Sequence, residues 1–217
     1  MRNLQKAGGI AALVAAGTYL FALGLAAIVL GPMADPGLAY RDYMSFLGTH
    51  KSLVFVWHAV MYLVNGICLV VLVPALYERL KPAAPRLARI AASFGFLWTG
   101  FVFLSGVITN QGTEALLALH GRDPAAAEAL KTALDTVTLG IDSSDRLLGS
   151  LWVGLSSLAA VKGEAFPRPL AIFGMLIGAA GLVGTAIPAA VAVAYAFGVG
   201  AIFWWAGVGI RMLRTRP

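Results

Sequence analysis

The residues best placed to do chemistry in this sequence are Asp142, Asp145 and Arg146, where a charged segment runs into an apolar one. The apolar part, from Leu147 to Val161, has 15 residues, whereas a helix needs roughly 20 to cross the hydrocarbon core of a membrane. A span here must include its polar end, which brings the three charged side chains to or below the outer membrane surface. Ionisable groups at that depth are costly and indicate a functional site.

Further polar side chains fall at a similar height when about 20 residues are counted from the cytoplasmic end of each predicted span. The outer boundary then lies near His58 on span two, near Asn110 on span three and near Asp142 on span four. We therefore predict an outer-leaflet polar pocket between these spans, which binds or passes a small molecule, a lipid headgroup or an ion. Its predicted lining is His58, Asn65, Asn110, Gln111, Glu114, Asp142, Asp145 and Arg146.

The helical phase of span four supports this prediction, because a polar stripe on a membrane helix should face the bundle interior or a water-filled cavity. The same acids also fit an N-terminal cap, in which Asp142 accepts hydrogen bonds from free backbone N–H groups and Asp145 lies in the first turn. Capping alone would explain both acids, and capping and site formation are not exclusive. The stripe consists of Thr138, Asp142, Asp145, Gly149, Trp152 and Ser156.

His58 has several possible roles: a metal or haem ligand, a proton relay, or a hydrogen-bonded histidine at a helix interface, which we favour. Haem ligation by two histidines would need a second one within the spans, and there is none. A divalent-metal site formed by His50, His58 and His120 with a carboxylate is chemically possible. The sequence specifies no metal or other cofactor, and it contains no GxSxG, HExxH, P-loop or CxxC motif.

The composition is that of a helical membrane protein. Hydrophobic residues make up 59% of the 217 residues, charged residues 12%, and the mean hydropathy is +0.83. Soluble domains are about half apolar and a quarter charged. The apolar residues also form runs of 20 or more, which predicts membrane-spanning helices.

These runs predict an all-α, polytopic helix bundle with six transmembrane spans in one domain, residues 1–217. Turn signals at Pro36-Gly37 and Pro188 separate neighbouring elements. We also expect a short interfacial helix near Tyr40, and an outer amphipathic helix that begins after Asp123 and ends at Gly140. The predicted spans are Gly8 to Leu30, Ser52 to Tyr77, Leu87 to Asn110, Asp142 to Val161, Leu170 to Ile187 and Ala189 to Ile210.

The charge distribution predicts the orientation of the bundle. Eleven of the 16 lysines and arginines, Arg2 and Arg216 among them, fall on the side of the termini, and eight of the ten acidic residues fall on the other. Cytoplasmic loops carry the excess of Lys and Arg, so both termini are predicted to be cytoplasmic. Orientation thus explains the net charge of +6, and we expect the lipid bilayer, not nucleic acid, as partner.

Two alternative functions follow from other residues. Glycine pairs in spans five and six, Gly174/Gly178 and Gly181/Gly184, permit close helix packing. They suggest an accessory or scaffold subunit that binds a membrane-protein partner through these spans. The second alternative is an intramembrane enzyme, lipid-acting or metal-dependent, that uses His58 with Asp142, Asp145 or Glu114 as acid–base groups.

Two stretches carry a resemblance to a known family: LQKAGGIAALVAAGTYL near the start, and LLGSLWVGLSSLAAVKGEAFPRPLAIFGMLIGAAGLVG from span four onward. With the six-span plan, they resemble bacterial membrane proteins of family 4386 among the domains of unknown function. The resemblance implies this fold and a multi-pass location in the bacterial inner membrane, and it implies no activity. Its most specific residues are Phe166, Pro167, Arg168, Leu170, Ile172 and Gly174.

Overall fold

The computed structural model describes residues 2–35, 37–187 and 189–214, and of Arg2 only the backbone. Pro36, Pro188 and Arg216, used above as turn or topology signals, lie outside the described residues. Within the described residues the chain is helical and contains no strand. The elements are α1 (Arg2–Leu25), η1 (Ala26–Leu30), η2 (Gly31–Ala34), α2 (Tyr40–His58), η3 (Ala59–Val64), α3 (Asn65–Leu80), α4 (Pro85–His120), α5 (Pro124–Gly163), α6 (Arg168–Ala186) and α7 (Val191–Arg214).

Five helical stretches of the described chain are long and apolar enough to cross a membrane, so this is a multi-pass membrane protein. The helix α5 is not one of them, because its apolar part is short and contains serines. Span four, and with it the total of six spans, therefore remains a prediction. The five stretches are Asn3–Ala34, Tyr40–Leu80, Pro85–His120, Arg168–Ala186 and Val191–Arg214.

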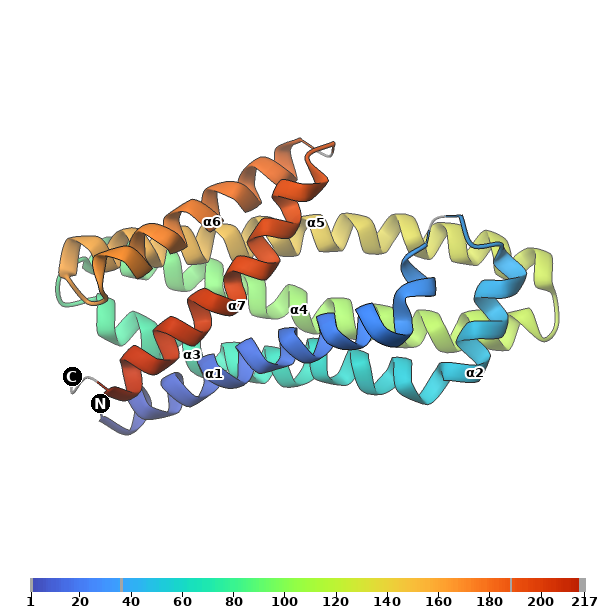
Figure 1. Ribbon diagram of the computed structural model, residues 1–217, viewed down its shortest axis with the longest axis horizontal. Coiled ribbons are helices and arrows are strands. Elements are labelled where there is room, and N and C mark those ends of the chain that lie inside the picture. The colour runs from blue at the N-terminus through green and yellow to red at the C-terminus, as the bar shows by residue number, and fades with distance from the viewer. Residues whose placement is uncertain (1, 36, 188, 215–217) are drawn as a thin grey trace.

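The helices form an elongated bundle whose two ends differ (Figure 1). We call the end that holds both chain termini the terminal end and the opposite one the distal end. At 1.5 Å per residue, α4 with 36 residues is about 54 Å long and α5 with 40 is about 60 Å long. Both exceed the roughly 30 Å of a hydrocarbon core. The helices α6 and α7 reach only part of the way toward the distal end, and there they lie away from the other helices.

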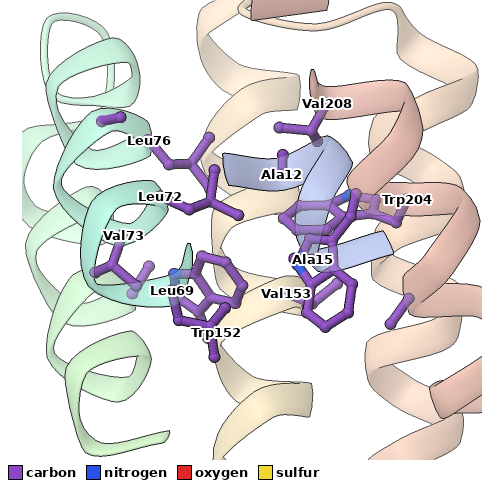
Figure 2. Close-up of a cluster of buried hydrophobic side chains, with 14 of the residues drawn as sticks. Ala12, Ala15, Leu69, Leu72, Val73, Leu76, Trp152, Val153, Trp204 and Val208 are labelled. Atoms are coloured by element: carbon purple, nitrogen blue, oxygen red, sulfur yellow. The ribbon is translucent and has the colours of Figure 1, made fainter. Parts of the chain in front are cut away.

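The main core lies in the terminal half, where α1, α3, α5 and α7 converge (Figure 2). Small residues of α1, such as Ala12 and Ala15, let the neighbouring helices approach closely, and leucines of α3 fill the space beside them. Lipid is as apolar as these side chains, so packing rather than hydrophobic transfer holds such a core together. A second, smaller core joins η1, α2, α4 and α5 in the distal half; its buried members are Leu30, Met44, Leu47, Val54, Leu116 and Ala127.

Both accessory helices differ from expectation. The interfacial helix is not separate: it forms the first turns of α2, which runs on through η3 into α3. Its apolar face, including Met44 and Leu47, packs against α4 and α5 instead of lying free in the interface. The outer amphipathic helix does begin after Asp123, but Gly140 does not end it. Glycine costs only about 1 kcal/mol inside a helix, and packing of α5 along α4 outweighs that cost.

The glycines of α6 do permit close packing, but inside the chain. A Cβ atom at Gly178 would lie 2.9 Å from the Cα of Gly154 in α5, and one at Gly174 would overlap the side chains of Ser157 and Trp204. Gly181 and Gly184 are likewise buried against Ser150 and Ala194. This glycine face is therefore occupied by α5 and α7, and the surface named above for a partner protein is not free.

Replacing Gly178 with alanine should lower the free energy of unfolding by about 2 kcal/mol, because the new methyl group meets backbone atoms that cannot rotate away. Gly100→Ala in α4 is the matched control: a Cβ there meets no atom within 4 Å. That change should stabilise by up to about 1 kcal/mol through helix propensity alone. Unfolding of the purified variants in mild detergent measures both; equal effects would show that the α5–α6 contact does not form.

Candidate functional site

Asp142 and Asp145 lie in the interior of α5, so they do not cap a helix. The N-cap of this helix is Asp123, whose Oδ1 accepts a hydrogen bond from the Ala126 N–H at 3.0 Å. Inside a continuous helix the backbone N–H groups are already bonded to carbonyls. Ser143 and Ser144 donate to the carbonyl oxygens of Leu139 and Gly140. The capping explanation is therefore wrong, and the two acids need another one.

Both acids line a partly open cavity of about 590 Å³, which we call the six-helix cavity. Its walls come from α1, η3, α4, α5, α6 and α7, so every long helical stretch of the bundle contributes. The volume is typical of a site for a small molecule. The residues around it are Tyr19, Met61, Tyr62, Val102, Leu139, Asp142, Ser143, Asp145, Arg146, Gly184, Thr185, Val191, Ala194, Tyr195, Phe197 and Gly198.

The cavity lies at one level of the bundle. Each wall contributes one lining residue that is 17 to 19 residues along its helix from the terminal end of the bundle. This number of residues corresponds to about 26–29 Å of helix. A hydrocarbon core is roughly 30 Å thick. If the terminal ends mark one membrane boundary, the cavity lies just inside the other. The residues counted are Tyr19, Tyr62, Val102, Asp145, Thr185 and Tyr195.

The charges in the cavity are incompletely paired. Oδ1 of Asp145 is buried and has no hydrogen-bond partner in the described chain, although the indole of Trp98 lies beside the carboxyl group. Arg146 interacts electrostatically with Asp142 and Asp145. It forms no ion pair with either among the described residues, and its Nη1 donates a long hydrogen bond, 3.4 Å, to the Gly184 carbonyl. Two acids and one base give the lining a formal charge of −1.

Aromatic side chains surround these charges. Tyr19 and Tyr62 interact electrostatically with Asp142 and Asp145, and Tyr195 of α7 lines the cavity at its exposed edge. Aromatic faces attract cations, so rings beside carboxylates favour a positively charged ligand.

Four fully buried tryptophans form the next layer toward the terminal end, and Figure 2 shows two of them, Trp152 and Trp204, in the core. Trp98 is central: its ring centroid is 5.5 Å from that of Trp152, and it stacks on Trp205 at 5.7 Å. The centroids of Trp152 and Trp204 are 5.6 Å apart. Gly95 and Gly149 make room for Trp152 and Trp98, since a Cβ at either glycine would lie 2.7 Å from the ring. This closely packed layer lies between the acids and the terminal end.

The other predicted site residues lie elsewhere, so the expectation of one shared chamber needs correction. His58, Asn110 and Gln111 line a separate cavity of about 230 Å³ between η3 and α4. Glu114 forms an exposed ion pair with Lys51 at 2.9 Å. Asn65 is buried deeper in the bundle. Tyr62 borders both cavities.

Local hydrogen bonds explain these positions. His58 is only 2% exposed, and its Nδ1 hydrogen-bonds Oδ1 of Asn110 at 2.8 Å, as expected for a histidine at a helix interface. Asn65 donates from Nδ2 to Oγ1 of Thr18 at 2.9 Å and thereby joins α3 to α1. Hydrogen bonds of this kind join neighbouring helices within a membrane bundle, so both side chains serve helix packing, although Oδ1 of Asn65 has no partner among the described residues.

The structure does not assemble the alternative metal or acid–base sites. His50 hydrogen-bonds the Phe46 carbonyl and His120 the Tyr40 hydroxyl, so the three histidines are separated. In the described part of the chain, no group of three His, Cys, Asp or Glu residues is arranged to hold a metal ion. The cavity of His58 has no carboxylate in its lining, and the proposed pairing of this histidine with Asp142, Asp145 or Glu114 is absent from it.

Counting along the sequence finds the charged residues of the six-helix cavity but misses its other walls. Tyr62 carries a usable signal, because it lies one turn after His58 on the same helical stretch. Thr185 and Tyr195 carry none, because isolated polar residues near span ends usually mark the membrane interface. Tyr19 carries none either, because an aromatic residue in the middle of a predicted span is most simply a core residue. The polar stripe on α5 is confirmed below the acids, where Gly149, Trp152 and Ser156 are buried; Thr138 faces a smaller cavity of about 100 Å³.

Comparison with known proteins places the chain in a family. No curated protein sequence and no solved structure matches it. The family described as Domain of unknown function (DUF4386) matches residues 9–213, from the second turn of α1 to the last turn of α7, and so includes every wall of the six-helix cavity. The chain therefore belongs to this family of unknown function.

Proposed function

We propose that this protein is a membrane-embedded binding protein that holds a small, positively charged molecule in the six-helix cavity. The carrying observation is the Asp145 carboxyl group: beside the Trp98 indole, its Oδ1 is buried without a hydrogen-bond partner among the described residues, in a cavity of net charge −1. A buried carboxylate is costly unless a cation or a donor satisfies it. A bound ammonium group would do so, and the tyrosine rings around it would add cation–π attraction.

The proposal includes a topology. We propose a single domain of six spans with α5 as the fourth, both termini in the cytoplasm, and the distal halves of α4 and α5 outside a bacterial inner membrane. The cavity would then lie at the outer leaflet, as expected for the predicted pocket, with walls from all six spans instead of three. The lengths of α4 and α5 support this placement, because neither helix fits within a bilayer core.

The alternatives receive less support. A scaffold role would need a docking face other than the glycine face of α6, which α5 and α7 occupy. An enzyme would need an acid–base pair, and His58 lies in a separate cavity from Asp142 and Asp145. The scaffold role also leaves the two acids in the interior of α5 unexplained.

The test compares benzylamine, cationic at neutral pH, with benzyl alcohol, a neutral molecule of similar shape. Titration calorimetry of the purified protein in mild detergent should show that Asp145→Asn weakens benzylamine binding at least tenfold, about 1.4 kcal/mol, and leaves benzyl alcohol unaffected. The matched control is Asp135→Asn on the same helix, since Asp135 is exposed and paired with Lys131 at 2.6 Å. Equal binding by wild type and Asp145→Asn would exclude the proposed function.

A further inference from the structure

We propose that the natural ligand is a phospholipid with an amine headgroup, which reaches the six-helix cavity sideways from the bilayer between α1 and α7. The ammonium group would lie against Asp145 and Asp142, the phosphate against Arg146, and the acyl chains outside the protein. This inference rests on the proposed function, because it assigns a lipid to the same cation-binding cavity.

The lateral path into the cavity lies where α1 and α7 diverge. At the terminal end α1 and α7 touch: a Cβ at Gly209 would lie 2.8 Å from the Gly9 carbonyl oxygen. They are still in contact beside the cavity, where the ring of Tyr19, which lines it, meets that of Trp205 edge to face at 5.0 Å. Beyond that level α7 runs away from α1 and from the rest of the bundle (Figure 1). The cavity lies there, and Tyr195 at its edge is 68% exposed.

The opening faces an apolar surface. Leu20 and Leu23 on the α1 side and Val191 on the α7 side are all exposed large hydrophobic residues. Gly198 lines the cavity, and a Cβ built on it would meet no atom within 4 Å, so the space beside it is free. A ligand with a polar head and apolar chains matches this change from charged to apolar along one path. A wholly water-soluble amine would make no contact with the apolar surface beside the opening.

The charges favour a headgroup that carries both signs. Asp142, Asp145 and Arg146 line the same cavity, and the arginine makes no ion pair within it among the described residues. The guanidinium group presents a planar fork of donors that fits phosphate oxygens. A simple cation would bring the net charge of the lining to zero, but it would offer no acceptor to the remaining N–H donors of the arginine. An amine phospholipid supplies both a cation for the acids and phosphate oxygens for the arginine, whereas an anionic phospholipid supplies only the phosphate.

Native mass spectrometry tests this with the purified protein in detergent containing equimolar phosphatidylethanolamine and phosphatidylglycerol. We expect the wild type to retain phosphatidylethanolamine over phosphatidylglycerol by at least tenfold. Asp145→Asn should abolish that preference, and Arg146→Gln should lower retention of phosphatidylethanolamine at least fivefold. Gly198→Leu, which fills the free space at the opening, should lower it likewise. Gly100→Leu, on an exposed surface with equal free space, should leave it unchanged.

Free glycerophosphoethanolamine, which has the same phosphodiester and ammonium groups but no acyl chains, separates the two proposals. If it binds as tightly as the lipid and Gly198→Leu has no effect, lipid access is overturned while binding of an amine stands. If both lipids are retained equally and Asp145→Asn changes nothing, the lipid proposal fails. The benzylamine titration then tests the proposed function independently of the lipid. Loss of benzylamine binding together with all lipid preference would overturn both.

Discussion

Replacing Trp98 with alanine should lower the free energy of unfolding by about 3 kcal/mol. In soluble cores, such a change costs 3–5 kcal/mol through lost transfer free energy and the cavity left behind. Within a membrane the transfer contribution is smaller, because the unfolded reference also lies in lipid, and the cavity contribution remains. Trp98 is 0% exposed and touches rings from α5 and α7, so its removal would loosen three helices together.

The control for this prediction is Trp57→Ala, the same change at a partly exposed position. Trp57 donates one hydrogen bond to the Ala22 carbonyl at 3.0 Å and packs against the smaller distal core. We expect its loss to cost about 1 kcal/mol, close to the value of a single hydrogen bond. Thermal or denaturant unfolding in one detergent compares the two variants. If Trp57→Ala were the more damaging, the tryptophan layer would not be what holds the terminal half together.

The sequence predicts the class of fold because apolar runs of 20 residues have few alternatives. With no water to bond the backbone, such a run must form a helix. Turn signals such as Pro85 at a first helical turn and Asp123 as N-cap also fix real helix ends. These signals are local, since the residue that stops or starts the helix acts on its own neighbours.

Helix ends that depend on packing against neighbouring helices are harder to predict from the sequence. Gly140 has the low helix propensity of a helix end, yet α5 continues through it. Close by, Leu134 of α5 packs over Gly112 of α4, 3.0 Å from where a Cβ would be. Nothing within α5 reveals this support. The sequence favours capping by Asp142 and Asp145 for the same reason, because a helix that began at Gly140 would need a cap there.

Equal height along the spans did not suffice to predict a shared cavity. His58 and Asp145 are both near the outer boundary by residue count, but η3 turns His58 toward Asn110 on α4, and the acids face α6 and α7. His58 and Asp145 are separated because they point in different directions around their helix axes, and because of the order in which the helices are arranged in the bundle. These depend on long-range packing, and a count along one chain contains no information about it.

Cysteine labelling should show that Ala125 lies outside the membrane and that both Pro82 and Glu164 lie inside. In a Cys68→Ala background, an impermeant maleimide should label Ala125→Cys in intact spheroplasts, and Pro82→Cys and Glu164→Cys only after permeabilisation. All three positions are exposed ends or turns next to α3, α4 and α5. We expect this pattern because the terminal end carries the excess of lysine and arginine, which favours a cytoplasmic location for that end.

The three positions together decide whether α5 crosses the membrane. If Glu164→Cys is labelled along with Ala125→Cys in intact spheroplasts, α5 does not cross, and the five apolar stretches are the only spans. If Pro82→Cys and Glu164→Cys are labelled and Ala125→Cys is not, the bundle is inverted and the cavity opens toward the inner leaflet. The expected pattern alone places Asp142, Asp145 and Arg146 at the outer leaflet, because each then lies 17 to 21 residues of a spanning helix from the cytoplasmic end of α5 at Gly163.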